Sequence, residues 1–252
     1  ASGDTTIEAE NLIEKPYIQM TLRWLEEQCI EIGVIPSPGA ESWSEGATGC
    51  RFRVPGNQSY HAFDRAIPAD WSSATFFMCA AAITGSNLTL LGLDMNDTQG
   101  DKAVADMLAA MGVTVEPVAD GLRIVGGPLR GAEFDLADTP DALPAMAVTA
   151  CFAEGETRLV NVPQARLKET DRIAVMHEEL SKMGADIEEL PDGLVIRGRQ
   201  LKPAFVHGHA DHRVIMALAV AGLALDGETT ISTAEALSVT FPTFVEVMKS
   251  AG

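Results

Sequence analysis

The sequence predicts a mixed α/β (α+β) protein built from repeated β-α-β-α-β-β units. The first observation behind this prediction is that an aspartate opens a long apolar run, closed by a glycine, at Asp70, Asp141 and Asp211. The offsets are 71 residues (141 − 70) and 70 residues (211 − 141). The second observation is that each run leads into a short β-like stretch and then a second helical run that ends in glycine. A fixed period of this kind indicates one structural unit used several times.

The opening stretch, residues 5–56, resembles only the back half of a unit. It predicts a strand over TTIEAENL, a helix from about Pro16 to Ile32, and a strand pair that ends near FRVPG. Its aspartate-led first helix is absent.

The later elements follow the period of the repeat. First helices are predicted over residues 71–84, 142–154 and 212–226, β-like stretches over 88–93, 156–162 and 228–232, and second helices over 101–111, 171–183 and 241–251. Two strand pairs, 113–127 and 185–199, are each joined by an Asp-Gly turn, which is a strong hairpin signal. A strand just before each leading aspartate would complete the unit. Because no strand pair follows the last helix, we expect a piece of a longer protein or a second chain that supplies the missing elements.

The amino-acid composition excludes some classes of function. The chain has 252 residues, 46% of them hydrophobic, and a formal charge of −18, which argues against nucleic-acid and anionic membrane partners. No apolar run reaches membrane-spanning length without a charge or a helix breaker. The four cysteines lie far apart without Cys-x-x-Cys spacing, so neither a zinc site nor a disulfide framework is indicated. We expect an acidic, cytoplasmic protein.

One basic cluster stands out against this acidic background. Residues 164–172, QARLKETDR, place Arg166, Lys168 and Arg172 between a strand and the start of a helix. Free backbone N–H groups and the helix dipole would add to these cations to bind a phosphate or a carboxylate. The alternative is that Thr170 caps the helix, Asp171 lies in its first turn, and the basic groups are solvated or paired. Residue spacing favours neither interpretation.

The segment Asp211-His212-Arg213 also begins a helix. Arg213 is a candidate ligand for a second anionic group, and His212 is interpreted as a local hydrogen-bonding partner. Asp211 is interpreted as an N-cap, because Asp70 and Asp141 share its position in the repeat. Asp141 has two open interpretations, as a helix cap or as a general base within reach of a substrate hydroxyl.

Several segments together resemble one enzyme family. They are PADWSSATFFMCAAAITG, TQGD, DTPDALPAMAVTACFAEGETRLVNV, RLKETDRI, DHRVIMALAVAG and TFPTF. In this order and spacing the chain is similar to the C-terminal two thirds of the 5-enolpyruvylshikimate-3-phosphate synthase family. The Lys-Glu-Thr-Asp-Arg run disfavours the sister family, the UDP-N-acetylglucosamine enolpyruvyl transferases.

The resemblance implies a protein of two lobes, each with three units whose sheets face outward and whose helices pack within. Residues 1–66 would be the final unit of the N-terminal lobe, and residues 67–252 the C-terminal lobe of three units, the last incomplete. The rest of the N-terminal lobe would precede Ala1, so we expect an N-terminally truncated chain.

The resemblance also implies an activity that needs no metal or organic cofactor. The family transfers the enolpyruvyl group of phosphoenolpyruvate to the 5-hydroxyl of shikimate 3-phosphate and releases phosphate, a step of aromatic amino-acid biosynthesis. By motif, Asp141 would accept the hydroxyl proton and Glu169 would take part in proton transfer at the phosphoenolpyruvate carbon. The substrate-binding residues implied in the same way are Lys168, Arg172, Arg213, Gln164 and Tyr17.

Two departures from the family pattern leave a second hypothesis open. Val239 stands where many members have a lysine, and Glu14 where many have a phosphate-binding serine. The alternative is therefore a non-catalytic anion-binding or assembly module of the same fold. Because the family's cleft must close between both lobes to exclude water, we expect this chain alone to be inactive.

Overall fold

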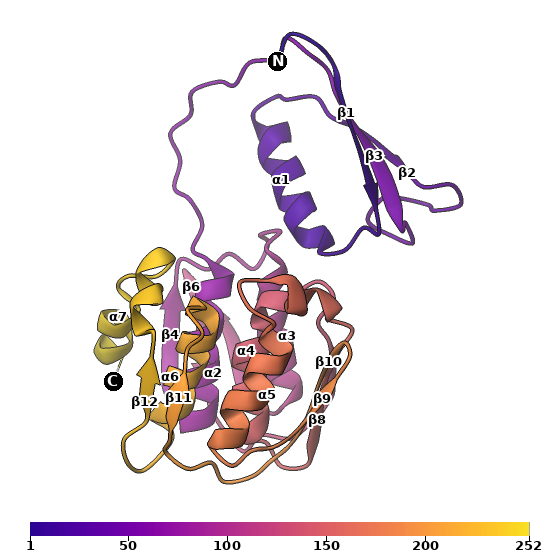
Figure 1. The fold of residues 1–252 in the computed structure, drawn as a ribbon. Helices are drawn as coiled ribbons and strands as arrows, with labels where there is room; N and C mark the ends of the chain where they lie inside the picture. Colours follow the sequence, from indigo (N-terminus) through magenta and orange to yellow (C-terminus); the bar gives the residue numbers. More distant parts are fainter. Residues whose placement is uncertain (252) are drawn as a thin grey trace. The chain divides into compact units, whose positions relative to one another are not determined.

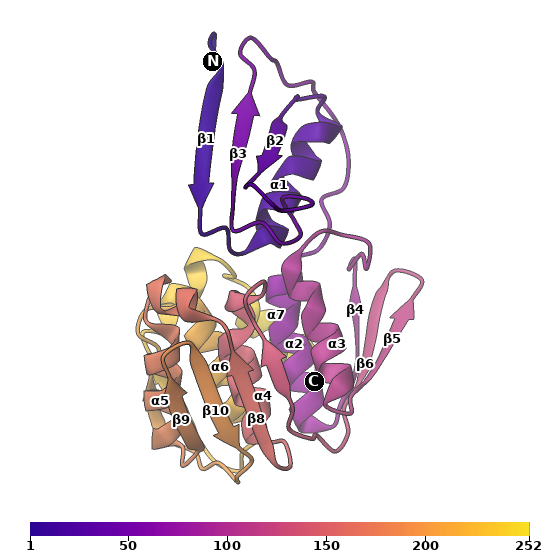
Figure 2. The same ribbon diagram turned by 90° about the vertical axis from the view of Figure 1, so that its right-hand side faces the viewer.

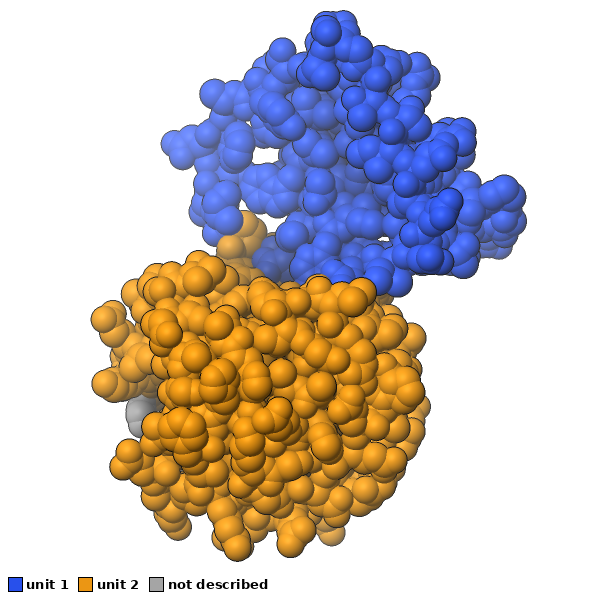
Figure 3. All heavy atoms as spheres, in the orientation of Figure 1, with its two compact units in different colours: residues 1–67, 97–100 blue, residues 68–96, 101–252 orange. Residues whose placement is uncertain are grey.

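The computed structural model describes residues 1–251. The described chain divides into two compact units (Figure 3). Unit 1 comprises residues 1–67 and 97–100, and unit 2 comprises residues 68–96 and the described residues from 101 onward.

Unit 1 is a small antiparallel sheet with one helix. The strands β1 (Thr5–Glu10), β2 (Gly33–Pro36) and β3 (Gly49–Val54) lie in the order β1-β3-β2, and α1 (Lys15–Glu27) lies along one face of this sheet (Figure 2). In the central strand Phe52 pairs with Ile7 on one side and Val34 on the other. None of the α1 side chains is fully buried.

Helix α1 is shorter than the sequence predicted, because it ends at Glu27 and not near Ile32. The Cys29 N–H donates to the Glu26 carbonyl and the Ile30 N–H to the Leu25 carbonyl, at 2.8 and 2.9 Å. This is a Schellman termination, with Cys29 at φ 56° in the position that glycine usually fills. Cysteine is not a residue type that indicates a helix end, so the sequence predicted a helix that was too long.

Unit 2 has a core of helices with sheets around them (Figures 1 and 2). Its helices are α2 (Trp71–Thr84), α3 (Ala103–Ala110), α4 (Leu143–Cys151), α5 (Arg172–Lys182), α6 (His212–Leu223) and α7 (Phe244–Ser250). All nine α4 residues are buried, as are ten of the fourteen in α2. A helix that is apolar on every side must be surrounded by other elements, so α2, α4 and α6 pack on one another at the centre.

Three sheets cover the helices of unit 2. One contains β4 (Asn87–Leu91), β5 (Thr114–Val118) and β6 (Gly121–Val125) in the order β4-β6-β5. The second contains β7 (Glu133–Asp135), β8 (Glu156–Val160), β9 (Asp186–Leu190) and β10 (Gly193–Arg197) in the order β7-β8-β10-β9. The third pairs β11 (Phe205–His207) with β12 (Thr230–Ser232) in parallel. The mixed α/β fold, with helices inside and sheets outside, is as predicted.

The two Asp-Gly sequences do form hairpins, but the glycines are not in the turns. Val118 pairs with Gly121 and Leu190 with Gly193, so Ala119-Asp120 and Pro191-Asp192 form the two-residue turns. A Cβ on Gly193 would lie 1.9 Å from the Leu159 carbonyl oxygen of the neighbouring strand. The glycine is therefore required by the close approach of β8.

The strand predicted before each leading aspartate is present in two cases and missing in the third. Strands β7 and β11 precede Asp141 and Asp211, each paired in parallel with the next strand. Before Asp70 the chain is irregular, and the Ala69 N–H donates to the Gly92 carbonyl, just after β4, at 3.1 Å. Pro68 has no N–H to extend a ladder there.

Among residues 1–251, none of the helices combines the length and the hydropathy needed to cross a bilayer. The four cysteines are free thiols, three of them buried.

Candidate active site

The starts of α2, α4, α5 and α6 bring charged side chains together in unit 2. Asp70 caps α2 by accepting from the N–H groups of Ser72 and Ser73, and Asp211 caps α6 by accepting from the Arg213 N–H. Asp171 caps α5 by accepting from the Ala174 N–H. The first backbone N–H groups of a helix have no partner within the helix, so a region where several helices start has a positive electrostatic potential.

Arg172, the first residue of α5, is at the centre of the cluster and its side chain is 1% exposed. Its Nε donates to Asp211 Oδ2 at 2.8 Å, its Nη1 to Asp141 Oδ1 at 2.7 Å, and its Nη2 to Glu169. Burial alone would lower the pKa of Arg172, but the hydrogen bonds and charge of Asp211, with Asp141 and Glu169, raise it. The guanidinium therefore holds three carboxylates in fixed positions.

Asp141 is surrounded by cations. It lies in the 3-10 turn Pro140–Ala142 that leads into α4, and its carboxylate is 3.2 Å from Arg213 Nη2 and 3.8 Å from Lys168 Nζ. Burial acts to raise the pKa of Asp141, but the charges of Arg213, Arg172 and Lys168 outweigh burial and lower it. Asp141 is therefore ionised at neutral pH. It does not cap α4, so of the two interpretations that the sequence left open for Asp141, the helix cap is ruled out.

Arg213 links α6 to the neighbouring elements. Its Nη1 donates to Ser72 Oγ on α2, and its Nη2 approaches Asp141. Asp101, before α3, is 3% exposed and interacts with Ser72, Arg213 and Asp141. Burial raises the pKa of Asp101 to about 6, with Ser72 and Arg213 opposing the rise and Asp141 adding to it.

Glu169 forms the more open side of the cluster, beside the buried His212. The Glu169 side chain is 49% exposed, and its Oε1 lies 3.8 Å from His212 Nδ1. Burial, followed by the charge of Arg213, lowers the pKa of His212, so its imidazole is neutral at pH 7. A half-exposed carboxylate that is held at one oxygen by Arg172 is able to move a proton to or from a bound molecule.

The other predicted site residues lie in different surroundings. Gln164 is buried and its Nε2 donates to the Ala137 carbonyl at 2.9 Å, so the amide supports the segment before Asp141. Arg166 is not available to a ligand, because Asp171, Glu189 and two backbone carbonyls accept its N–H groups. Tyr17 belongs to α1 of unit 1.

Two expectations for the basic segment are corrected by these contacts. Asp171, and not Thr170, is the N-cap of α5. The Thr170 hydroxyl donates instead to Asp211 Oδ2 at 3.2 Å. Asp211 is both a cap and an ion-pair partner, a double role that the sequence could not reveal because Arg172 is 39 residues away.

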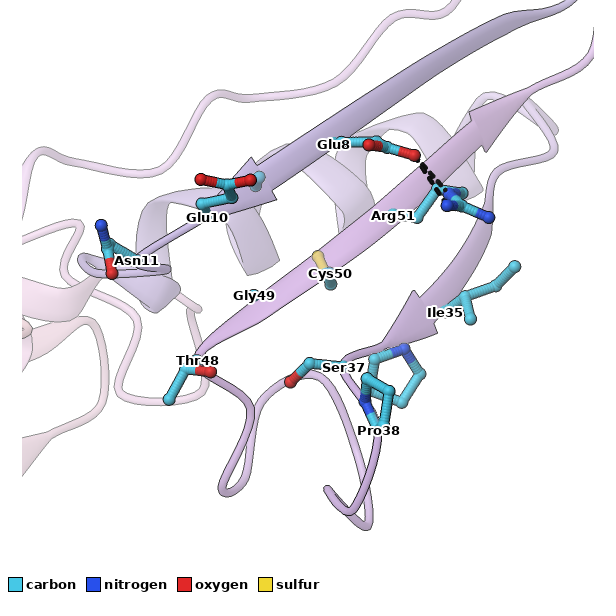
Figure 4. A pocket seen from close by; sticks show the side chains of 12 residues that line it. Glu8, Glu10, Asn11, Ile35, Ser37, Pro38, Thr48, Gly49, Cys50 and Arg51 are labelled. Atoms are coloured by element: carbon cyan, nitrogen blue, oxygen red, sulfur yellow. Dashed lines mark hydrogen bonds and ion pairs between the residues drawn. The ribbon is translucent and has the colours of Figure 1, made fainter.

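Unit 1 has a groove of about 560 Å³ with different chemistry (Figure 4). It is lined by backbone and side chains at the ends of β1, β2 and β3, with the carboxylates of Glu8 and Glu10 on its wall. Arg51, the cation that lines it, is paired with Glu8 at 2.7 Å. This groove does not offer the free positive charge that a phosphate requires.

A family model for EPSP synthase (3-phosphoshikimate 1-carboxyvinyltransferase) matches residues 1–248. The chain belongs to the EPSP synthase family. A 3-phosphoshikimate 1-carboxyvinyltransferase of Ruminiclostridium cellulolyticum is 55% identical over 249 residues, which is 99% of this chain and 56% of the relative. A 3-phosphoshikimate 1-carboxyvinyltransferase of Acetivibrio thermocellus is 50% identical, again over 99% of this chain and 56% of the relative. The EPSP synthase of Acinetobacter baumannii has a similar structure, with a TM-score of 0.79 at 29% identity over 100% of this chain and 57% of that one.

The chain thus spans about half the length of the curated EPSP synthase relatives that it matches. Sequence reasoning did not assign a role to Asp101 or Ser72 in the charged cluster. Both were within segments that carried the family resemblance, TQGD and the stretch after Asp70, so the signal was present.

Proposed function

We propose that the protein to which this chain belongs transfers the enolpyruvyl group of phosphoenolpyruvate to the 5-hydroxyl of shikimate 3-phosphate. The observation that carries the proposal is an ionised Asp141 held among Lys168, Arg172 and Arg213 at converging helix starts. One carboxylate among several cations suits a reaction in which a hydroxyl loses a proton beside two anionic substrates.

In the proposed mechanism Asp141 accepts the proton of the 5-hydroxyl as its oxygen bonds to C2 of phosphoenolpyruvate. Glu169 supplies a proton to the methylene carbon C3, which gives a tetrahedral adduct. Glu169 then takes a proton back from C3 while the bond between C2 and the phosphate oxygen breaks. The proton held by Asp141 leaves with the released phosphate, which restores both carboxyl groups to their starting states. Lys168 and Arg213 hold the phosphate and carboxylate groups during these steps. Arg172, which is buried against Asp141 and Glu169, keeps these two carboxylates in position.

The remaining assignments are part of the same proposal. Gln164 and Tyr17 contribute to shikimate 3-phosphate binding, Gln164 by supporting the segment before Asp141. Residues 1–66 form the final unit of an N-terminal lobe and residues 67–252 most of a C-terminal lobe. The family's other segments complete the cleft, and the protein works in the cytoplasm without a metal or an organic cofactor.

Phosphate release by a chimera tests this proposal. The upstream part of the Ruminiclostridium cellulolyticum relative, which this chain does not match, is joined to Ala1, and phosphate is measured with both substrates. We expect turnover by the chimera and none by the 252-residue chain alone. In the chimera, Asp141→Asn should lower kcat by about 100-fold or more, whereas Asp138→Asn, at an exposed position three residues upstream, should leave kcat unchanged.

Other results would point to the alternatives. Val239 is 78% exposed at the end of a 3-10 turn, so it presents an apolar side chain where the family has a cation. A folded chimera that binds both substrates by calorimetry but releases no phosphate would support the non-catalytic module. Turnover with UDP-N-acetylglucosamine in place of shikimate 3-phosphate would indicate the sister activity.

A further inference from the structure

A second cluster of ionisable groups lies between the C-terminal half of α5 and the turn after β11. It consists of Glu178, Glu179 and Lys182 on α5 and His209 in the turn, and we call it the Glu-His cluster. None of these residues has a role in the proposed reaction. The nitrogen and carboxylate oxygens of Glu178, Glu179 and His209 lie within 4.8 Å of one another.

The Glu179 carboxylate is the fixed part of the Glu-His cluster. It is fully buried, and its Oε2 accepts the His207 backbone N–H at 2.8 Å. A buried carboxylate with one oxygen held by the backbone keeps its other oxygen in a constant place.

That other oxygen, Glu179 Oε1, faces both a nitrogen ligand and a cation. It is 2.7 Å from His209 Nε2 and 2.8 Å from Lys182 Nζ. Lys182 Nζ is also 2.9 Å from Glu178 Oε1. The ammonium group therefore lies between the two carboxylates and donates to both.

The turn that carries His209 holds this arrangement at a conformational cost. His209 and Ala210 have φ angles of 52° and 55°, although neither is glycine. Such residues cost of order 1 kcal/mol each and persist where surrounding contacts fix them. Here the His209 N–H donates to His207 Nδ1 at 2.9 Å, and the ring reaches back to Glu179.

We propose that Glu178, Glu179 and His209 bind a divalent transition-metal ion such as Zn²⁺, and that the Lys182 ammonium fills the position when no metal is bound. One imidazole and two carboxylates suit Zn²⁺, Co²⁺ or Ni²⁺, whereas Mg²⁺ requires octahedral oxygen ligands. Lys182 is 41% exposed on a flexible side chain, so it can move into solvent when the metal enters. The proposal does not depend on the enolpyruvyl transfer proposed above.

Calorimetric titration of the untagged chain with ZnCl₂ tests this site. We expect one site per chain, weakened at least about tenfold by His209→Ala and by Glu178→Gln, because each removes one ligand. Lys182→Met should bind Zn²⁺ several-fold more tightly, because it removes the competing cation and keeps the length of the side chain. His177→Ala is the matched control, since His177 is a part-exposed histidine of the same helix outside the cluster.

Circular dichroism spectra and unfolding midpoints establish that each variant is folded. A Co²⁺ titration followed by visible absorption gives a second readout, in which the d–d bands should be lost in His209→Ala and kept in His177→Ala. Absence of Zn²⁺ binding by both the parent chain and Lys182→Met would overturn the proposal. Equal binding by His209→Ala and the parent would place the ion elsewhere and overturn it as well.

Discussion

At the scale of single residues, Arg172 is the side chain whose removal should most weaken the fold. Its guanidinium is buried against Asp211, which is fully buried, and against Asp141. Arg172→Ala leaves these carboxylates without their partner, and breaking a buried ion pair in this way costs about 3 to 5 kcal/mol.

Arg197→Ala is the control for Arg172→Ala. Arg197 also approaches three carboxylates, but all four side chains are more than two fifths exposed, and exposed pairs contribute about 1 kcal/mol or less. Urea unfolding of both variants measures the difference. Equal losses of stability would show that the Arg172 cluster is far better solvated than its burial indicates.

Asp101 should make stability depend on pH. Well below pH 3.8, the ordinary pKa of the group, the side chain is protonated in both the folded and the unfolded states. As pH rises through 4 to 6, the unfolded chain loses the proton while the folded state, with a pKa of about 6, retains it. Folding then takes up a proton, so this group's contribution to stability falls with rising pH until both states are ionised.

Comparison of Asp101→Asn with the parent isolates this effect. Between pH 5.0 and 7.5 the variant should gain about 1.4 kcal/mol of stability relative to the parent, because asparagine does not titrate. Urea midpoints at the two pH values give the difference, and Asp106→Asn, at an exposed position on α3, corrects for the change in net charge. A stability difference that is the same at both pH values would contradict the raised pKa.

The aspartates show how much of the site a sequence can locate. The local pattern correctly indicated caps at Asp70 and Asp211, because a cap depends only on the next three residues. The buried contact of Asp211 with Arg172, and the departure of Asp141 from the cap geometry, depend on helix packing across the repeats. The sequence has no local signal for either.

At the scale of elements, the strand next to each hairpin restricts the residue after the turn. Gly193→Ala would place a Cβ 1.9 Å from the Leu159 carbonyl oxygen, a backbone atom that cannot move without separating β8 from β10. We expect a loss of about 3 kcal/mol or more, in the range of severe steric substitutions.

Gly127→Ala is the matched control, because its added Cβ would meet its nearest neighbour, the Gly112 carbonyl oxygen, at an ordinary 3.7 Å. It should change stability by less than about 1 kcal/mol. Thermal unfolding monitored by circular dichroism compares the two. If both variants melt together, β8 and β10 must be able to separate at little cost.

The same elements explain the limits of the element prediction. Periodicity and turn chemistry found the hairpins and the central helices, because their signals are local. The early end of α1 at Cys29 and the missing strand before Asp70 were not found. Both depend on backbone conformations and hydrogen bonds that residue types alone do not encode.

At the scale of the whole molecule, the two units differ greatly in buried apolar surface. Among the described residues, the buried apolar side chains of unit 1 are Ile30, Ala47, Cys50 and Phe52, whereas unit 2 contains an extensive core. Large apolar side chains of unit 1, such as Ile7 and Ile35, are more than half exposed. Because hydrophobic burial is the main stabilising contribution, the free energy of unfolding should be lower for unit 1 than for unit 2.

Native-state hydrogen exchange with peptide resolution tests this difference. Amides of β1 and β3 should exchange through openings of low free energy, while those of β8 and β10 should exchange only on global unfolding of unit 2. Phe52→Ala should speed exchange in unit 1 and leave unit 2 unchanged, and Leu194→Ala, at a fully buried position of β10, should speed exchange in unit 2. Equal protection in both units would mean that they unfold as one cooperative body, and the small core of unit 1 would then owe its stability to unit 2.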